Sequence, residues 1–130
     1  MSVSATLTET ITIGGRAVTN SVTYTSGSSL SISETIVTAT TDGLVACVLD
    51  VSQIKLFYMV SNVAITVETN SASAPDNTYT LAAGVPLVWK NDGEVALADV
   101  FAADITALYV TNASGSSSTF EVYCIYDPTV

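Results

Sequence analysis

The chain has 130 residues, of which 48% are hydrophobic and only 12% charged, and three cations face twelve carboxylates for a net charge of −9. A domain of this length buries about two-thirds of its extended-chain surface, so it needs neither disulfide nor metal to fold. The charge argues against nucleic acid and anionic membranes as partners. No run approaches the ~18 apolar residues of a membrane span, and no secretory signal opens the chain. We therefore expect a chain that is not secreted and is synthesised in the cytoplasm of a host.

The first thirteen residues carry the clearest pattern. Apolar and polar residues alternate from Val3 to Ile13, which predicts a half-buried strand of eleven residues. Gly14-Gly15 predicts a turn, and weaker alternation follows over 18–24. A long strand is a liability at an exposed edge unless it is paired. Residues 1–13 are thus either a long edge strand of the domain's own sandwich or an assembly arm that adds to a neighbour's sheet. The candidate interface residues of this segment are Val3, Ala5, Leu7 and Ile11.

The rest of the chain predicts short strands with turn residues about every ten positions. The predicted strands span 30–37, 44–49, 54–60, 63–69, 78–81, 86–90, 105–111 and 119–126. Residues 40–43 and 91–93 predict turns, 61–62 predicts a tight hairpin turn, and 96–103 could form one helical turn. The pattern favours residues 1–130 as a single antiparallel β-sandwich, jelly-roll-like or Ig-like, with about nine or ten short strands and little helix.

Apolar side chains inside these strands supply the expected core. The nearly continuous apolar runs at 44–49, 54–60 and 63–69 suit strands covered on both faces. Nine strand residues should be largely buried: Leu44, Val48, Leu56, Tyr58, Ile65, Val67, Leu87, Val122 and Cys124. Cys47 and Cys124 lie in such runs, which favours buried free thiols over a disulfide. Trp89, next to Lys90, is a further candidate interface residue, although packing into its own core is favoured.

Catalytic residues are hard to find in this sequence. The chain has no histidine, which removes the commonest general base, the usual triads and most zinc sites. A pair of carboxylates is the one remaining catalytic device, and its candidates are Asp92, Glu94, Asp99 and Asp104. Carboxylates on exposed turns are normally solvated, so we expect no enzyme, no catalytic residue and no bound cofactor.

Two kinds of ligand site stay open as weaker alternatives. A calcium ion could be bound by Asp76 with Asn77, or by Asn91, Asp92 and Glu94, although no spacing matches a known calcium loop. A sugar-binding groove would need exposed aromatic side chains. The candidates are Trp89, Tyr79, Tyr109, Tyr123 and Tyr126, and core or inter-subunit packing is the default role of such residues on strands.

Four phrases resemble small all-β virion proteins from the structural gene modules of tailed bacteriophages. They are Asp50-Val51-Ser52 and the segments at 65–70, 81–89 and 108–115. The resemblance spans over half of the chain but involves structural phrases, so no functional residue carries over. It implies a virion component, and a head decoration or cement protein fits the size and the lack of chemistry best.

The resemblance also implies partners and location. A cement protein binds the major capsid protein on the capsid exterior, commonly as a homo-oligomer with a trimer favoured, and clamps neighbouring capsid subunits. It contacts no nucleic acid and no membrane, which agrees with the acidic composition. The alternatives are a tail or fibre component of the virion and a carbohydrate-binding β-sandwich module.

Overall fold

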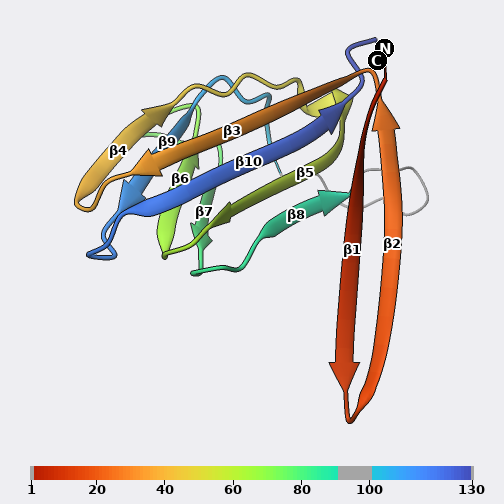
Figure 1. The fold of residues 1–130 in the computed structure, drawn as a ribbon. Coiled ribbons are helices and arrows are strands. Elements are labelled where there is room, and N and C mark those ends of the chain that lie inside the picture. The colour runs from red at the N-terminus through yellow and green to blue at the C-terminus, as the bar shows by residue number, and fades with distance from the viewer. Residues whose placement is uncertain (1, 91–100, 130) are drawn as a thin grey trace.

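The computed structural model describes residues 2–90 and 101–129, which form a two-sheet body and a projecting hairpin (Figure 1). One sheet of the body has the strand order β3-β10-β5-β8 and the other β4-β9-β6-β7. Their bounds are β3 Ser28–Ile36, β4 Thr40–Val45, β5 Ile54–Ser61, β6 Ile65–Thr69, β7 Thr78–Leu81, β8 Leu87–Lys90, β9 Leu108–Asn112 and β10 Ser118–Tyr126. The hairpin consists of β1 (Val3–Ile13) and β2 (Arg16–Ser26).

The strand pairing makes the body a jelly roll. β3 pairs with β10, β4 with β9, β5 with β8 and β6 with β7, all antiparallel. Residues 28–126 therefore form one long antiparallel ribbon of strand pairs, and successive pairs belong to alternate sheets. The additional pairs β5–β10 and β6–β9 join these strand pairs within each sheet. The predicted all-β antiparallel sandwich is confirmed, and the pairing selects the jelly-roll alternative over the Ig-like one.

The core lies between the two sheets and follows the alternation of the strands. In β10, Phe120, Val122 and Cys124 point inward and are buried, whereas Glu121 and Tyr123 between them point outward. β5 is covered on both faces, as its apolar run predicts. Phe57 and Met59 face the core, and on the outer face Leu56 is buried under the hairpin while Tyr58 and Val60 are half-buried. Five of the nine expected core residues are buried, namely Leu56, Ile65, Val67, Val122 and Cys124, and Tyr58 and Leu87 are half-buried.

The prediction was wrong for Leu44 and Val48, which are 66% and 74% exposed. β4 is an edge strand, and Val45, Cys47 and Leu49 supply the inward-facing side chains of this segment. Because side chains of a strand alternate between faces, Leu44 and Val48 point away from the core. A continuous apolar run does not reveal that one face of its strand is left uncovered.

Two turn predictions also need correction. Residues 40–43 belong to β4, where the pairing shifts between Thr40 and Gly43 and Asp42 has a φ of 50°, so the turn residues form an irregularity inside the strand. Ser61 and Asn62 do not close a hairpin, because β5 and β6 lie in different sheets. The buried Ser61 hydroxyl donates to the Val63 carbonyl at 2.6 Å and stabilises this passage between the sheets.

Helix is nearly absent from the described residues. Val51–Gln53 forms a single 3-10 turn, and the Asp50 carboxylate accepts the Ser52 backbone N–H at 2.9 Å at its start. None of the helices in the described part of the chain is long and apolar enough to cross a membrane. The predicted turn at 91–93 and most of the ambiguous segment at 96–103 lie outside the described residues.

Candidate assembly interface

The N-terminal segment forms its own two-stranded sheet. β1 and β2 pair along their whole lengths, from Val3 opposite Ser26 to Ile13 opposite Arg16. Gly14 and Gly15 close the turn with φ of 56° and 81°, the left-handed values that a tight two-residue hairpin turn requires and glycine adopts without strain. Residues 1–13 are thus not an edge strand of the sandwich but one half of a separate hairpin, and their role as an assembly arm stays a prediction. We call the hairpin over residues 3–26 the arm and the two sheets over residues 28–126 the body.

The arm has one apolar face and one hydroxyl face. On the hydroxyl face, cross-strand side chains meet at 2.9–3.0 Å in three successive pairs: Thr6 with Thr23, Thr8 with Ser21, and Thr10 with Thr19. Odd-numbered residues of β1 lie on the other face and are apolar except at Glu9, and β2 adds Asn20 and Arg16 as well as apolar side chains to this face. Cross-strand pairs of this kind stabilise a hairpin by a few tenths of a kcal/mol to about 1 kcal/mol each.

The base of the arm packs on the outer face of the β3-β10-β5-β8 sheet. Its contacts form a second apolar cluster, made of Tyr24, Leu56 and Ile125 with Val3, Ala5, Leu7, Val22 and Val88 around them. At the edge of this cluster, the Lys90 Nζ lies 2.7 Å from the Glu9 Oε1. Both side chains are substantially exposed, so this pair contributes at most about 1 kcal/mol. Apolar burial therefore holds the base of the arm on the body.

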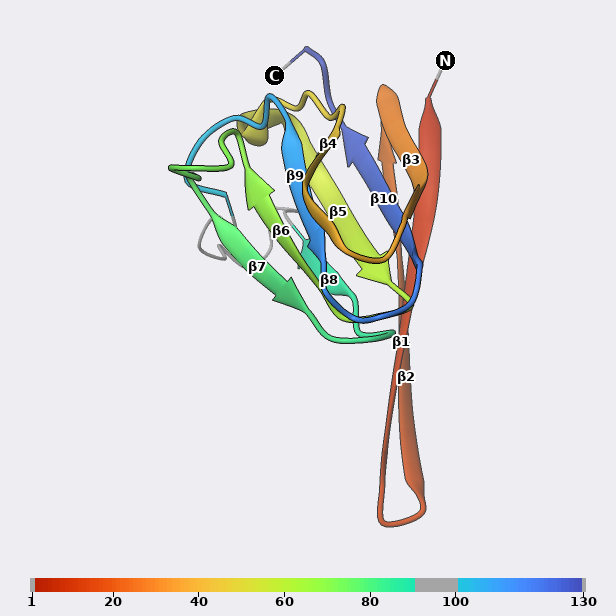
Figure 2. The ribbon, with the colours of Figure 1, turned by 90° about the vertical axis from the view of Figure 1, so that its left-hand side faces the viewer.

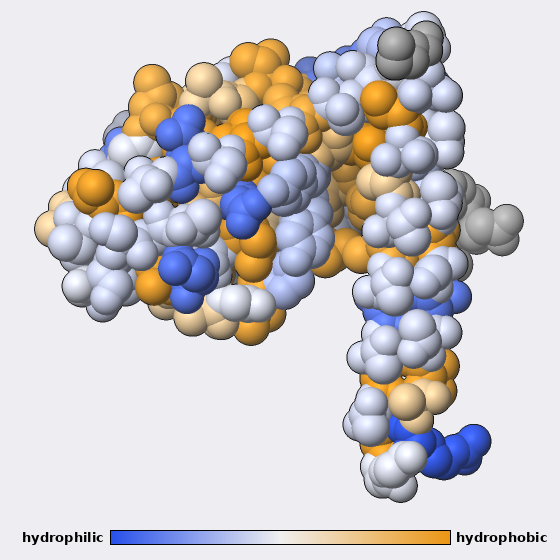
Figure 3. All heavy atoms as spheres, in the orientation of Figure 1, coloured by the Kyte–Doolittle hydropathy of each residue, from blue (hydrophilic) through white to orange (hydrophobic). Residues whose placement is uncertain are grey.

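Beyond Glu9 the arm leaves the body, as two views at right angles show (Figures 1 and 2). Ile11, Ile13 and Val18 are 63%, 73% and 68% exposed, and together with Arg16 they line an open hollow. We call these three apolar residues the tip patch. Apolar surface on the distal part of the arm is visible in Figure 3. Exposed apolar surface on a projecting element is typical of a contact site for another chain.

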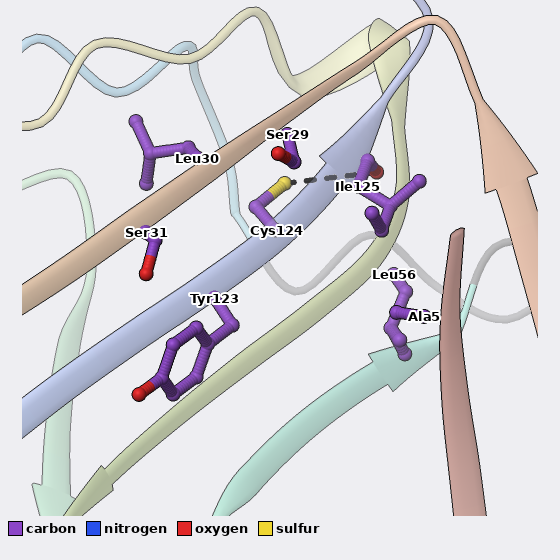
Figure 4. A pocket seen from close by; sticks show the side chains of 8 residues that line it. All are labelled: Ala5, Ser29, Leu30, Ser31, Leu56, Tyr123, Cys124 and Ile125. Carbon is purple, nitrogen blue, oxygen red and sulfur yellow. Dashed lines mark hydrogen bonds between the residues drawn. The ribbon is translucent and has the colours of Figure 1, made fainter. Parts of the chain in front are cut away.

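A second apolar feature lies where β1 crosses the body. A groove of about 150 Å³ opens beside the base of the arm (Figure 4). Its lining residues are Ala5, Ser29, Leu30, Ser31, Leu56, Tyr123, Cys124 and Ile125. Ala5 is the single contribution of the arm, and the other residues come from β3, β5 and β10. The Tyr123 hydroxyl donates to the Glu121 carboxylate beside this groove.

The structure separates the candidate interface residues into three groups. Val3, Ala5 and Leu7 are half-buried at the base of the arm, and Ile11 is exposed in the tip patch. Trp89 is only 2% exposed and packs 6.1 Å from the Phe101 ring, so it belongs to the core and not to the surface. Sequence reasoning missed Ile13 and Val18 of the tip patch, although the alternation on both sides of Gly14-Gly15 carried the signal.

The other candidate ligands hold loops together. The Asp104 carboxylate accepts the Val51 N–H at 3.0 Å, and Asp76 accepts the Asn70 side-chain amide at 2.6 Å. Asn77 accepts the Ala102 N–H at 2.8 Å. Within residues 2–90 and 101–129, no three His, Cys, Asp or Glu side chains gather where they could hold a metal ion. The candidates Asn91, Asp92, Glu94 and Asp99 lie outside the described residues.

The two cysteines are free and buried, as predicted, and no disulfide joins them. Burial raises the pKa of the Cys47 thiol to about 11. Burial also raises the pKa of the Cys124 thiol to about 12, with a further contribution from the charge of Cys47. Thiols with such raised pKa values carry almost no reactive thiolate near neutral pH.

The candidate sugar-binding aromatics do not gather in one place. Tyr79 and Trp89 both contact Phe101, with ring centroids 5.6 Å and 6.1 Å away. Tyr123 instead lies on the outer face of β10, 6.4 Å from the Tyr58 ring, and Tyr109 belongs to the opposite sheet. The structure therefore does not assemble the predicted groove from these residues.

Comparison with known proteins adds no relative, since no family model, no curated protein and no solved structure matches the chain. The likeness to phage virion proteins thus has its basis in the sequence phrases alone. The features of the protein that bear on its function are the arm, its tip patch and the groove beside its base.

Proposed function

We propose that this chain is a structural assembly protein, specifically a cement protein on the exterior of a tailed-phage capsid. It binds the major capsid protein and holds neighbouring subunits together. The observation that carries the proposal is the arm, which projects from the body and exposes Ile11, Ile13 and Val18. Such a projection is what a protein needs in order to reach a neighbour in an assembly.

The length of the arm fits this role. Eleven residues of strand span about 37 Å at about 3.4 Å per residue. The apolar contacts with the body end at Leu7 and Val22, and the ion pair of Glu9 with Lys90 follows them. An isolated two-stranded hairpin is marginally stable in water. The distal half adds exposed apolar surface without contributing to the core, so its retention is explained by contacts with another subunit.

The body and the charge agree with the same role. Jelly rolls occur in viral capsid and lectin domains, although a fold by itself does not decide a function. The net charge of −9 suits a capsid exterior better than a surface that faces packaged nucleic acid. A tail or fibre component uses the same features, and binding to phage heads separates a cement protein from it.

Shortening the arm tests the proposal. Replacing residues 8–21 by Gly-Gly keeps the paired residues Leu7 and Val22 and the apolar contacts of the base, while it removes the tip patch. We expect a folded protein with a melting temperature close to that of the full chain, and at least a tenfold loss of binding to phage heads that lack the protein. The measurement is electron microscopy of heads after addition of purified protein.

The matched control replaces Thr8 and Ser21 by Ala, which removes one hydroxyl pair and leaves the arm at full length. This control should bind heads as the unaltered chain does and protect them against heat. Equal binding by the shortened and full-length arms would refute the arm as the contact. No binding of the full chain to heads would refute the cement role and favour the tail.

A carbohydrate-binding module is the second candidate, and one observation favours it. Tyr58 and Tyr123 lie side by side on the outer face of the body with Glu121 bonded to Tyr123, which offers stacking surface and a carboxylate acceptor. Binding on a glycan array that is lost in Tyr123→Ala would support this role, and an array without binding would remove it.

A further inference from the structure

We propose that the free edge of β1 pairs antiparallel with β1 of a second copy of this chain, so that two arms form one four-stranded sheet around a two-fold axis. In the described part of the chain, β1 pairs with β2 alone, which leaves one edge open over eleven residues. An unpaired edge is a template for another strand. The inference goes beyond the proposed function, because it gives the arm a second copy of this chain as a partner, and its test in solution needs no capsid.

The edges of the body carry features that block pairing, whereas the edge of β1 carries none. β7 and β8 have only four residues each, and the pairing of β4 is irregular between Thr40 and Gly43. β3 places Glu34 on its core-facing side, opposite the buried Phe120, and a charge there disfavours a covering strand. β1 is long, contains neither proline nor lysine, and has Glu9 as its one charged residue.

The alternation of hydrogen bonds in antiparallel strands determines which backbone N–H and C=O groups of β1 point to its open edge. A two-residue turn closes on a hydrogen-bonded pair, here Ile13 and Arg16, and hydrogen-bonded and non-hydrogen-bonded pairs then alternate along the hairpin. The backbone groups of even-numbered residues in β1 therefore point away from β2. The close hydroxyl contacts of Thr6, Thr8 and Thr10 agree, because side chains approach most closely at non-hydrogen-bonded pairs.

One register pairs the backbone along the open edge of β1 and also places an apolar side chain at the groove. With Thr8 opposite Thr8 of the second copy, the strands overlap over residues 3–13 and both apolar faces lie on the same side. Ile11 of one copy then lies beside Ala5 of the other, which lines the apolar groove. A register centred on Leu7 would place the Glu9 carboxylate at that groove, and a register centred on Glu9 would set two Glu9 side chains opposite each other.

The groove also explains why β1 and not β2 supplies the interface. Ala5 of β1 lines it, and no residue of β2 does. Its volume of about 150 Å³ has room for an apolar side chain such as that of Ile11. The new strand pair would cover the groove of each body with the distal part of the other copy's β1. Each copy would then cover Ile11 and Ile13 of the other, whereas Val18 on β2 stays outside the contact.

The size of the contact sets the expected strength. An edge about 37 Å long and about 10 Å thick offers roughly 370 Å² per copy. With the two grooves added, the interface lies near the lower limit of about 1,000 Å² for a specific complex, so we expect association in the micromolar range. Each copy carries a charge of −9, so added salt should strengthen the pair. Because a two-fold contact closes on itself, it produces dimers, and a trimer would need another surface.

A cysteine pair tests the register. Thr8→Cys places a thiol opposite its own counterpart, where Cα atoms of hydrogen-bonded strand pairs lie about 5.5 Å apart and a disulfide can form. Ser21→Cys is the matched control, because Ser21 is exposed on the same face directly across the arm. Cys47 and Cys124 are buried and do not compete. Mild oxidation should give a covalent dimer of Thr8→Cys with at least tenfold higher yield than that of Ser21→Cys.

Sedimentation equilibrium over a wide concentration range tests the edge itself. Thr8→Pro removes an outward N–H from β1, whereas Ser21→Pro removes one from β2, and both spare the bonds inside the arm. We expect a dimer for the full chain and for Ser21→Pro, and at least tenfold weaker association for Thr8→Pro. Ile11→Ser should also weaken the dimer, while Val18→Ser, equally exposed on β2, should not.

The outcomes separate the two proposals. A monomeric full chain, a trimer, or a Thr8→Pro variant that still dimerises would overturn the strand pairing. If both proline variants are monomeric, the comparison of Ile11→Ser with Val18→Ser decides. Equal association of those two variants would also overturn the strand pairing. A dimer that binds no phage head would support the pairing and refute the cement role, whereas a monomer that binds heads would do the reverse.

Discussion

Replacing Phe101 by Ala is expected to lower the free energy of unfolding by about 3–5 kcal/mol, the usual cost of removing a buried aromatic ring. The side chain is 2% exposed. Its ring contacts Phe57 at 4.9 Å, Tyr79 at 5.6 Å and Trp89 at 6.1 Å, all in edge-to-face geometry. Because Phe57 and Trp89 belong to one sheet and Tyr79 to the other, Phe101 joins the two layers. The loss of stability has three sources: the ring no longer removes apolar surface from water, a cavity remains in its place, and three aromatic contacts disappear.

Urea unfolding followed by tryptophan fluorescence measures the effect, since Trp89 lies in the same cluster. Phe101→Leu is the matched variant and should lose less, because it keeps most of the buried apolar volume. Val85→Ala, at a side chain that is 57% exposed, should change the free energy of unfolding by no more than about 0.5 kcal/mol. A loss below about 1 kcal/mol for Phe101→Ala would show that this ring does not hold the sheets together.

Local alternation made the strands predictable. The predicted bounds of the first strand and of the strand at 78–81 match β1 and β7, and the segment at 119–126 falls within β10. In these segments the period of two and the flanking turn residues point to the same answer. The pairing of strands was harder, because a jelly roll pairs strands that are distant in sequence, such as β3 with β10. Local patterns carry no information on such partners, so Ser61-Asn62 resembled a hairpin turn.

The arm is a second case in which the local sequence pattern does not reveal contacts between distant segments. The alternation of β1 and the glycine pair predicted a long strand and a turn, yet whether the strand joins the sandwich depends on which surface covers its apolar face. Leu56 and Ile125 cover only the base. Trp89 is the opposite case. Its place beside Lys90 suggested an interface, but side chains alternate between the two faces of β8 and that of Trp89 points into the core. Burial of a single side chain is decided by packing between distant segments.

High pH is expected to destabilise the fold through the two buried thiols. Burial raises the pKa of Cys47 from 9.0 to about 11 and that of Cys124 from 9.0 to about 12. In the unfolded chain both thiols ionise from about pH 9 upward, whereas in the folded protein they stay neutral until the raised pKa is reached. Their contribution to stability is therefore complete below pH 9 and is lost as the pH rises toward 11–12.

The slope is about 1.4 kcal/mol per pH unit for each thiol above pH 9, so the free energy of unfolding should fall by about 3 kcal/mol between pH 8 and pH 10. Urea unfolding at a series of pH values measures the fall. The control carries Cys47→Ala and Cys124→Ala together, which lowers stability at every pH but should remove most of the slope below pH 10. The tyrosines with raised pKa values, Tyr79 and Tyr123, start from 10.0 and Lys90 from 10.5, so they contribute mainly above that window. An equal slope in the double variant would show that the thiols are not its origin.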